Sequence, residues 1–220
     1  MQAFRSLLRP DEKTGAAMRW AHRLWVFLWL TVFGLGIGLL SLYLAAYSCP
    51  GIDAQALWAS YFKLPLLVVM NLLLPLLVVY LGFFLFARPW AAYLLSAVPF
   101  LGLALASYYK IQLRGDPVLA SDLRLIRTAG GIMGNYTFEL TEPVKLVIAG
   151  FAGMLALSLV LLRRERMSQR GRLAGLMVML ALTLASYFEF YTSADIYEKT
   201  ANSGLINPWS ETEIYVSDQG

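Results

Sequence analysis

The sequence predicts an all-α membrane protein with five transmembrane helices, from its composition, the length of its apolar runs and the placement of its charges. Hydrophobic residues make up 59% of the 220 positions and charged residues only 15%, and the mean hydropathy is +0.61. Soluble domains are about 45–50% apolar and about 25% charged. The excess apolar surface must therefore face something other than water, and a bilayer provides such an environment.

Five apolar runs are long enough to cross the hydrocarbon core, which takes about 20 residues of helix. We predict spans at about residues 24–47, 64–86, 91–109, 144–162 and 173–191. The first run is too long for the apolar region of a cleaved signal peptide, so it is interpreted as a retained signal anchor. Between spans two and three, the sequence Ala87-Arg88-Pro89-Trp90 predicts a tight turn. Trp and Tyr residues lie near the predicted helix ends, as is typical of membrane interfaces.

The placement of Lys and Arg predicts the orientation. Eleven of them lie in residues 1–23, in the turn between spans two and three, and between spans four and five. These three segments share one side of the membrane if every span crosses. The other side holds seven, spread over far more chain. Because cytoplasmic loops carry an excess of Lys and Arg, we expect residues 1–23 to be cytoplasmic and residues 192–220 to be extracellular.

The predicted outer loop, residues 110–143, is rich in basic residues. Pro117 blocks continuation of the preceding helix, and Ser121 or Asp122 can cap a new one. The apolar residues that follow share one face, so we expect a short amphipathic helix in the outer interface. Candidate ligands for an anionic lipid headgroup are Lys110, Arg114, Asp122, Arg124 and Arg127. The alternative is that the cations only snorkel toward the membrane surface.

Gly34 and Gly38 form a GxxxG pattern in the first span. Such a pair can allow two membrane helices to pack closely. It can equally reflect the ordinary frequency of glycine in membrane helices.

Motifs for catalysis are missing from the sequence. There is no Gly-rich phosphate loop, no GxSxG elbow and no HExxH, and one Cys and one His are too few for a zinc site. Taken alone, the residues indicate a non-catalytic membrane module, with no cofactor in the chain and no nucleic-acid partner.

Two segments carry a resemblance to a known family. The run from Tyr109 through Arg114, Pro117 and Asp122, followed by Ala129-Gly-Gly and Tyr136, resembles the outer loop of the lipoteichoic acid synthase family. The run Asn207-Pro-Trp209-Ser-Glu-Thr resembles the linker that leads from span five to the outer domain of that family. The resemblance covers nearly the whole chain, but the residues that match the family specifically are confined to these two segments.

The resemblance implies the membrane domain of a phosphoglycerol transferase in a bacterial plasma membrane. It implies phosphatidylglycerol as a lipid partner and an extracellular sulfatase-like domain, in cis or as a separate chain, that binds Mn or Mg. The catalytic residues would belong to that domain, so this chain is not expected to be active alone. Two alternatives stay open, namely the membrane domain of a phosphoethanolamine transferase and a stand-alone membrane module without enzymatic activity.

Overall fold

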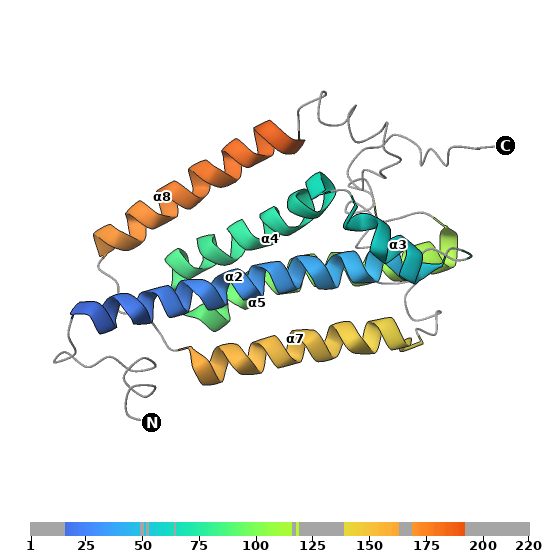
Figure 1. Ribbon diagram of the computed structural model, residues 1–220, viewed down its shortest axis with the longest axis horizontal. Coiled ribbons are helices and arrows are strands. Elements are labelled where there is room, and N and C mark those ends of the chain that lie inside the picture. The colour runs from blue at the N-terminus through green and yellow to red at the C-terminus, as the bar shows by residue number, and fades with distance from the viewer. Residues whose placement is uncertain are drawn as a thin grey trace, which may run out of the picture.

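The computed structural model describes residues 16–48, 51, 53–63, 65–115, 118, 139–162 and 169–191. This part of the chain is helical and contains no strand. In order, its elements are α2 (Ala16–Ala46), α3 (Ala54–Tyr61), α4 (Pro65–Phe86), α5 (Pro89–Arg114), α7 (Glu142–Leu161), α8 (Gln169–Ser186) and the π-helical turn η3 (Tyr187–Tyr191), as shown in Figure 1.

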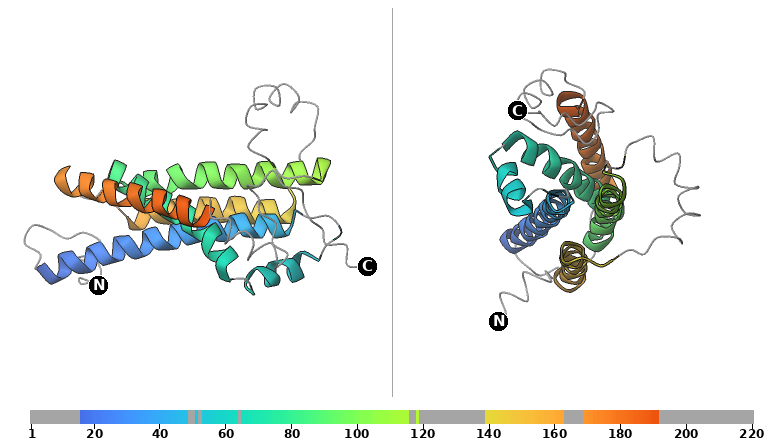
Figure 2. Two further views of the ribbon diagram at one scale, coloured as in Figure 1. Left: turned by 90° about the horizontal axis from the view of Figure 1, so that it is seen from above. Right: turned by 90° about the vertical axis from the view of Figure 1, so that its right-hand side faces the viewer.

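Among the described residues, five helices are long and apolar enough to cross a membrane. They are Trp20–Ala46, Val68–Phe86, Pro89–Arg114, Glu142–Leu161 and Gln169–Glu189. They lie side by side along one common direction, which both views of Figure 2 show. Each corresponds to one of the predicted spans, so the predicted all-helical fold with five candidate spans is confirmed.

The bundle has two ends, each formed by a different set of helix ends and connections. At one end, here called the turn end, lie the start of α2, the connection between α4 and α5, the end of α7 and the start of α8 (Figure 1). At the opposite end, here called the α3 end, lie α3, the end of α5 and the start of α7. Because the number of long helices is odd, the start of α2 and the end of α8 lie toward opposite ends of the bundle.

The connection between α4 and α5 is as tight as the sequence predicts. The backbone N–H of Ala87 donates to the carbonyl of Phe83 at 2.7 Å, and Pro89 stands at the first position of α5. Ala87 has φ 52°, a left-handed conformation that costs a residue with a Cβ about 1 kcal/mol. Pro89 contributes a fixed φ that suits a helix start and lacks a donor that would be left unpaired there.

Two helices extend beyond the predicted spans. The first helix begins at Ala16, ahead of the predicted span that starts near residue 24. The third long helix continues to Arg114, so Lys110 and Arg114 are helical and not part of a loop. The residues from Lys110 to Arg114 include good helix formers, which hydropathy alone does not register. The helix ends where Gly115 adopts φ 82° and its N–H donates to the carbonyl of Ile111 at 2.8 Å.

Helices α2, α4 and α5 form the centre of the bundle, and each packs extensively against the other two. A Cβ added to Gly34 would lie 2.6 Å from the Cα of Leu76, and one added to Gly38 would lie 3.0 Å from the carbonyl oxygen of Asn71. The close-packing interpretation of the GxxxG pair is therefore the correct one. The carbonyl of Asn71 is also the one that Pro75 leaves without its usual helical donor.

Aromatic rings connect α2 to α5 and α7 through the core. Trp25 and Trp29 lie 5.7 Å apart between ring centroids, and Trp29 lies 5.8 Å from Phe33. Phe33 contacts Tyr93 at 5.4 Å, and Tyr93 contacts Phe151 at 5.7 Å. The hydroxyl of Tyr93 donates to the backbone carbonyl of Phe151 at 3.1 Å, which satisfies a polar group inside the bundle.

Helix α8 packs at the edge of the bundle, mainly against α4. No described residue of α8 is buried. Its best-defined contacts lie near the turn end, where Gly175 faces the ring of Phe84 and Arg172 hydrogen-bonds the backbone at Phe84 and Leu85. Exposed apolar side chains of α8, such as Leu173, Met177 and Leu184, form a surface suited to lipid.

Candidate functional site

The basic residues Lys110 and Arg114 lie one helical turn apart at the C-terminal end of α5. Residues at i and i+4 share one side of a helix, so both side chains leave α5 on the same side. Lys110 is half-buried and Arg114 is exposed. The negative end of the helix dipole stabilises cations in this position. Two cations on one side of a helix end can bind a phosphate group.

Two tyrosines of α5 tie its end to the segment that leads into α7. The hydroxyls of Tyr108 and Thr141 share a hydrogen bond of 2.8 Å. The hydroxyl of Tyr109 donates to the backbone carbonyl of Glu139 at 3.0 Å. The two segments that flank residues 116–138 are therefore held together next to Lys110.

Gln112 connects the same end of α5 to the end of α2. Its side-chain amide donates to the backbone carbonyl of Ser48 at 3.1 Å. Ser48 is buried, and its hydroxyl donates to the carbonyl of Ala45 at 2.7 Å. The helix turn that carries Lys110 and Arg114 is thus fixed on two sides, toward α7 and toward α2. A fixed position lowers the entropy cost of binding a ligand.

Carboxylates also occur at the α3 end. Glu142 pairs with Lys145 at 2.7 Å, and both side chains are largely exposed. Such a pair contributes little to stability. The carboxylate of Glu142 partly offsets the charge of Lys145, which lies on α7 and not on α5.

The other predicted site residues lie outside the described residues. They are Asp122, Arg124 and Arg127 of the predicted headgroup site, the predicted interfacial helix, and Asn207 and Trp209 of the predicted linker. The candidate site is therefore described by Lys110, Arg114 and the contacts that fix their helix.

Sequence reasoning missed the short helix α3, which lies between the first two spans. Asp53 begins it, because its carboxylate accepts from the N–H of Gln55 at 3.0 Å. Trp58 of α3 lies 5.7 Å from Tyr43 of α2 and 5.1 Å from Phe62. Asp53 before an Ala-rich run was the signal that could have predicted it. This aromatic cluster matches the interfacial belt of membrane proteins.

No group of three or more His, Cys, Asp or Glu side chains that could hold a metal ion occurs in the described part of the chain. The arrangement at the end of α5 offers charge and hydrogen bonding for an anion.

No family model matches the chain, and neither the curated proteins nor the solved structures include a match to it.

Proposed function

We propose that this chain is the membrane domain of a lipoteichoic acid synthase-like phosphoglycerol transferase, and that the end of α5 binds the phosphate of its lipid substrate. The observation that carries the headgroup role is the placement of Lys110 and Arg114 on one side of a helix end fixed by Tyr108, Tyr109 and Gln112. The transferase chemistry would reside in a sulfatase-like outer domain with its own divalent metal, in cis or as a separate chain.

The proposed location is a bacterial plasma membrane, with the turn end in the cytoplasm. Four Arg side chains described at the turn end support this orientation, because cytoplasmic ends of membrane helices carry an excess of basic residues; they are Arg23, Arg88, Arg170 and Arg172. The α3 end, with Lys110 and Arg114, would then face the outside, where residues 192–220 would lead toward the outer domain.

Labelling of single cysteines tests this orientation. With Cys49 replaced by Ser, we expect Lys63→Cys at the α3 end to react with a membrane-impermeant maleimide added to intact cells. Arg170→Cys at the turn end should react only after the cells are opened. Both positions are exposed, so burial does not limit the reaction. The reverse pattern would show that the proposed orientation is wrong.

Substitution of the two cations tests the proposed function. In cells that carry the complete transferase, we expect Arg114→Gln to lower synthesis of the glycerol phosphate polymer about fivefold, and the double change with Lys110→Gln to lower it about 25-fold. These values correspond to about 1 kcal/mol for each basic residue near an anionic lipid. Mass spectrometry of the lipid products gives the measurement.

Lys145→Gln is the matched control, because Lys145 is an exposed cation at the same end that lies on α7 and not on the helix turn of Lys110 and Arg114. It should leave polymer synthesis unchanged. If the double variant retains full synthesis and full lipid binding, the headgroup role of α5 is excluded. If ethanolamine phosphate is the transferred group, the phosphoglycerol assignment is wrong while the headgroup site can still stand.

A further inference from the structure

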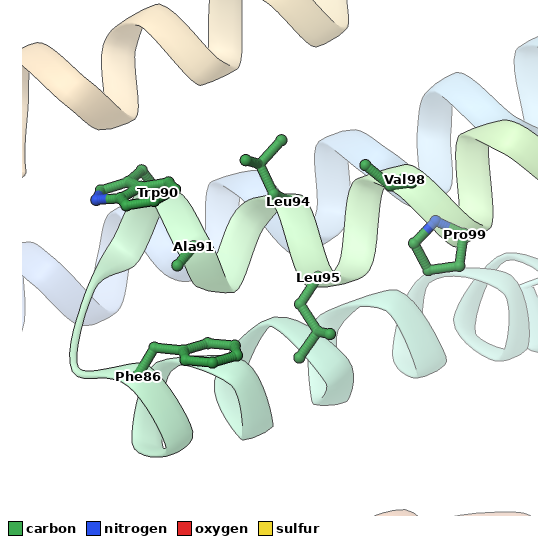
Figure 3. A pocket seen from close by; sticks show the side chains of 7 residues that line it. All are labelled: Phe86, Trp90, Ala91, Leu94, Leu95, Val98 and Pro99. Carbon is green, nitrogen blue, oxygen red and sulfur yellow. The ribbon is translucent and has the colours of Figure 1, made fainter.

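An apolar groove runs along the outer surface of α5 near the turn end, far from Lys110 and Arg114. It has a volume of about 480 Å³, and its lining is contributed by the end of α4 and the first half of α5. Figure 3 shows Phe86 and Trp90 at one end of the groove and Val98 and Pro99 at the other. Val98 is 59% exposed and Phe86 is 42% exposed, so the described residues leave the groove open to its surroundings.

The length of the groove matches one leaflet of a bilayer. From Trp90 to Pro99, α5 rises by about 13 Å at 1.5 Å per residue. Half of a hydrocarbon core of about 30 Å is about 15 Å. The groove starts at the helix end and stops near the middle of the proposed span. These dimensions suit an acyl chain that extends inward from a headgroup at the turn end.

The charges around the groove suit an anionic headgroup. Arg88 lies between Phe86 and Trp90 in the tight turn, and its side chain is exposed. The described acidic residues all lie on segments of the α3 end; they are Asp53, Glu139, Glu142 and Glu189. Arg88 therefore has no described carboxylate near it to compete with a phosphate. The indole nitrogen of Trp90 lies on the side of its ring away from Pro99, toward the turn (Figure 3).

The groove suits an acyl chain better than a helix of a second copy. Membrane helices associate through small residues that let two backbones approach closely. Ala91 is the only small residue that lines the groove, and the others are bulky. The small residues Ala92, Ser96 and Ala97 of α5 are buried within the bundle. A flexible chain can fill the irregular surface left between large side chains, whereas a rigid helix cannot.

We propose that this groove is a binding site for an anionic phospholipid of the leaflet at the turn end, with one acyl chain along Leu94, Leu95 and Val98 and the phosphate at Arg88. The site does not depend on the proposed transferase function, because it lies at the opposite end from Lys110 and Arg114. The bound lipid would fix the α4–α5 turn at the membrane surface.

Photo-crosslinking tests this site. The chain is placed in nanodiscs with phosphatidylglycerol or phosphatidylcholine that carries a diazirine on one acyl chain, and the adducts are mapped by mass spectrometry. We expect phosphatidylglycerol adducts to concentrate in residues 86–99. Arg88→Gln should lower them about fivefold, the ratio that one basic residue near an anionic lipid provides, and should leave phosphatidylcholine adducts unchanged. Val98→Trp fills the groove and should lower adducts of both lipids.

Arg170→Gln is the matched control, an exposed arginine at the same end that lies on α8 and not in the turn between Phe86 and Trp90. It should change neither set of adducts. Thermal unfolding shows whether Val98→Trp leaves the fold intact, as the exposure of Val98 predicts. The proposal is overturned if adducts are as frequent on α8 as on residues 86–99, or if Arg170→Gln acts like Arg88→Gln. It is also overturned if folded Val98→Trp retains all adducts, or if Val98→Cys, with Cys49 replaced by Ser, forms a disulfide-linked dimer in high yield.

Discussion

Replacing Gly34 by Ala is expected to destabilise the helix bundle by about 2 kcal/mol. The added Cβ would lie 2.6 Å from the Cα of Leu76, a backbone atom that cannot rotate away. Carbon atoms in contact normally lie about 3.5–4.0 Å apart, so α2 and α4 must separate by about 1 Å. We assign about 3 kcal/mol to this overpacking, and the gain from placing Ala instead of Gly within a helix offsets about 1 kcal/mol of it.

Unfolding in mixed micelles of increasing denaturing detergent measures the effect, and Gly102→Ala provides the control. Gly102 lies inside α5, and a Cβ added there meets no atom within 4 Å. We expect Gly102→Ala to stabilise by about 0.5–1 kcal/mol from helix propensity alone. The difference between the two variants isolates the steric cost, because both replace a helical Gly by Ala. Equal stabilities would show that α2 and α4 do not pack as described.

A third glycine of α2, Gly36, allows the cost of a contact with a backbone atom to be compared with the cost of a contact with a side chain. A Cβ on Gly36 would lie 2.7 Å from the sulfur of Met154, which belongs to a flexible side chain of α7. Met adapts to changes in shape, so Gly36→Ala should cost less than Gly34→Ala. The two added Cβ atoms would lie at nearly the same distance from their neighbours. The ranking therefore follows from the kind of atom approached, a backbone Cα for Gly34 and a side-chain sulfur for Gly36.

The sequence predicted the five helices because hydropathy is a property of each segment by itself. It also predicted the tight turn, because Pro89 restricts the local backbone. The GxxxG pattern left two interpretations open, since its meaning depends on whether Leu72 and Leu76 of another helix lie opposite it. That choice is a matter of tertiary packing, which a single sequence does not contain.

The prediction was less accurate at the ends of helices. Lys110 and Arg114 were expected in the outer loop because the predicted apolar span ends at about Tyr109, but a charged helical turn can extend beyond an apolar span. Helix α3 was missed because eight residues give a weak periodic signal. In both cases a capping residue sets the helix boundary: Gly115 ends α5, and the carboxylate of Asp53 begins α3. The spacing of Lys110 and Arg114 on one side of α5 became visible only with the helix boundary.

The attachment of α8 depends on a contact that no sequence pattern indicated. The Nε of Arg172 donates to the carbonyl of Phe84 at 3.2 Å, and its guanidinium also donates to the carbonyl of Leu85. These carbonyls lie in the last turn of α4, where the carbonyl groups have no backbone N–H partner within the helix. The side chain of Arg172 therefore acts as a C-terminal cap that comes from another helix. Residues 84 and 172 are far apart in sequence, and Arg172 was counted only as a basic residue of a cytoplasmic loop.

Arg172→Gln is expected to release the turn end of α8 from α4. Hydrogen bonds from a charged donor contribute about 1.5–3 kcal/mol each, and this side chain makes two of them. No described residue of α8 is buried, so its contacts with α4, such as Gly175 against the ring of Phe84, compensate only in part for their loss. Electron paramagnetic resonance distances between spin labels on α4 and α8 should change from one narrow distribution to a broad one. Arg172→Lys can donate to one carbonyl at a time and should give an intermediate width.

The neighbouring Arg170 provides the control for charge. Its side chain is exposed, so Arg170→Gln removes the same positive charge from the same helix end without breaking the bonds to α4. If the general attraction of basic residues to lipid headgroups holds α8 in place, both variants should broaden the distribution equally. If the cap on α4 holds it, only Arg172→Gln should do so.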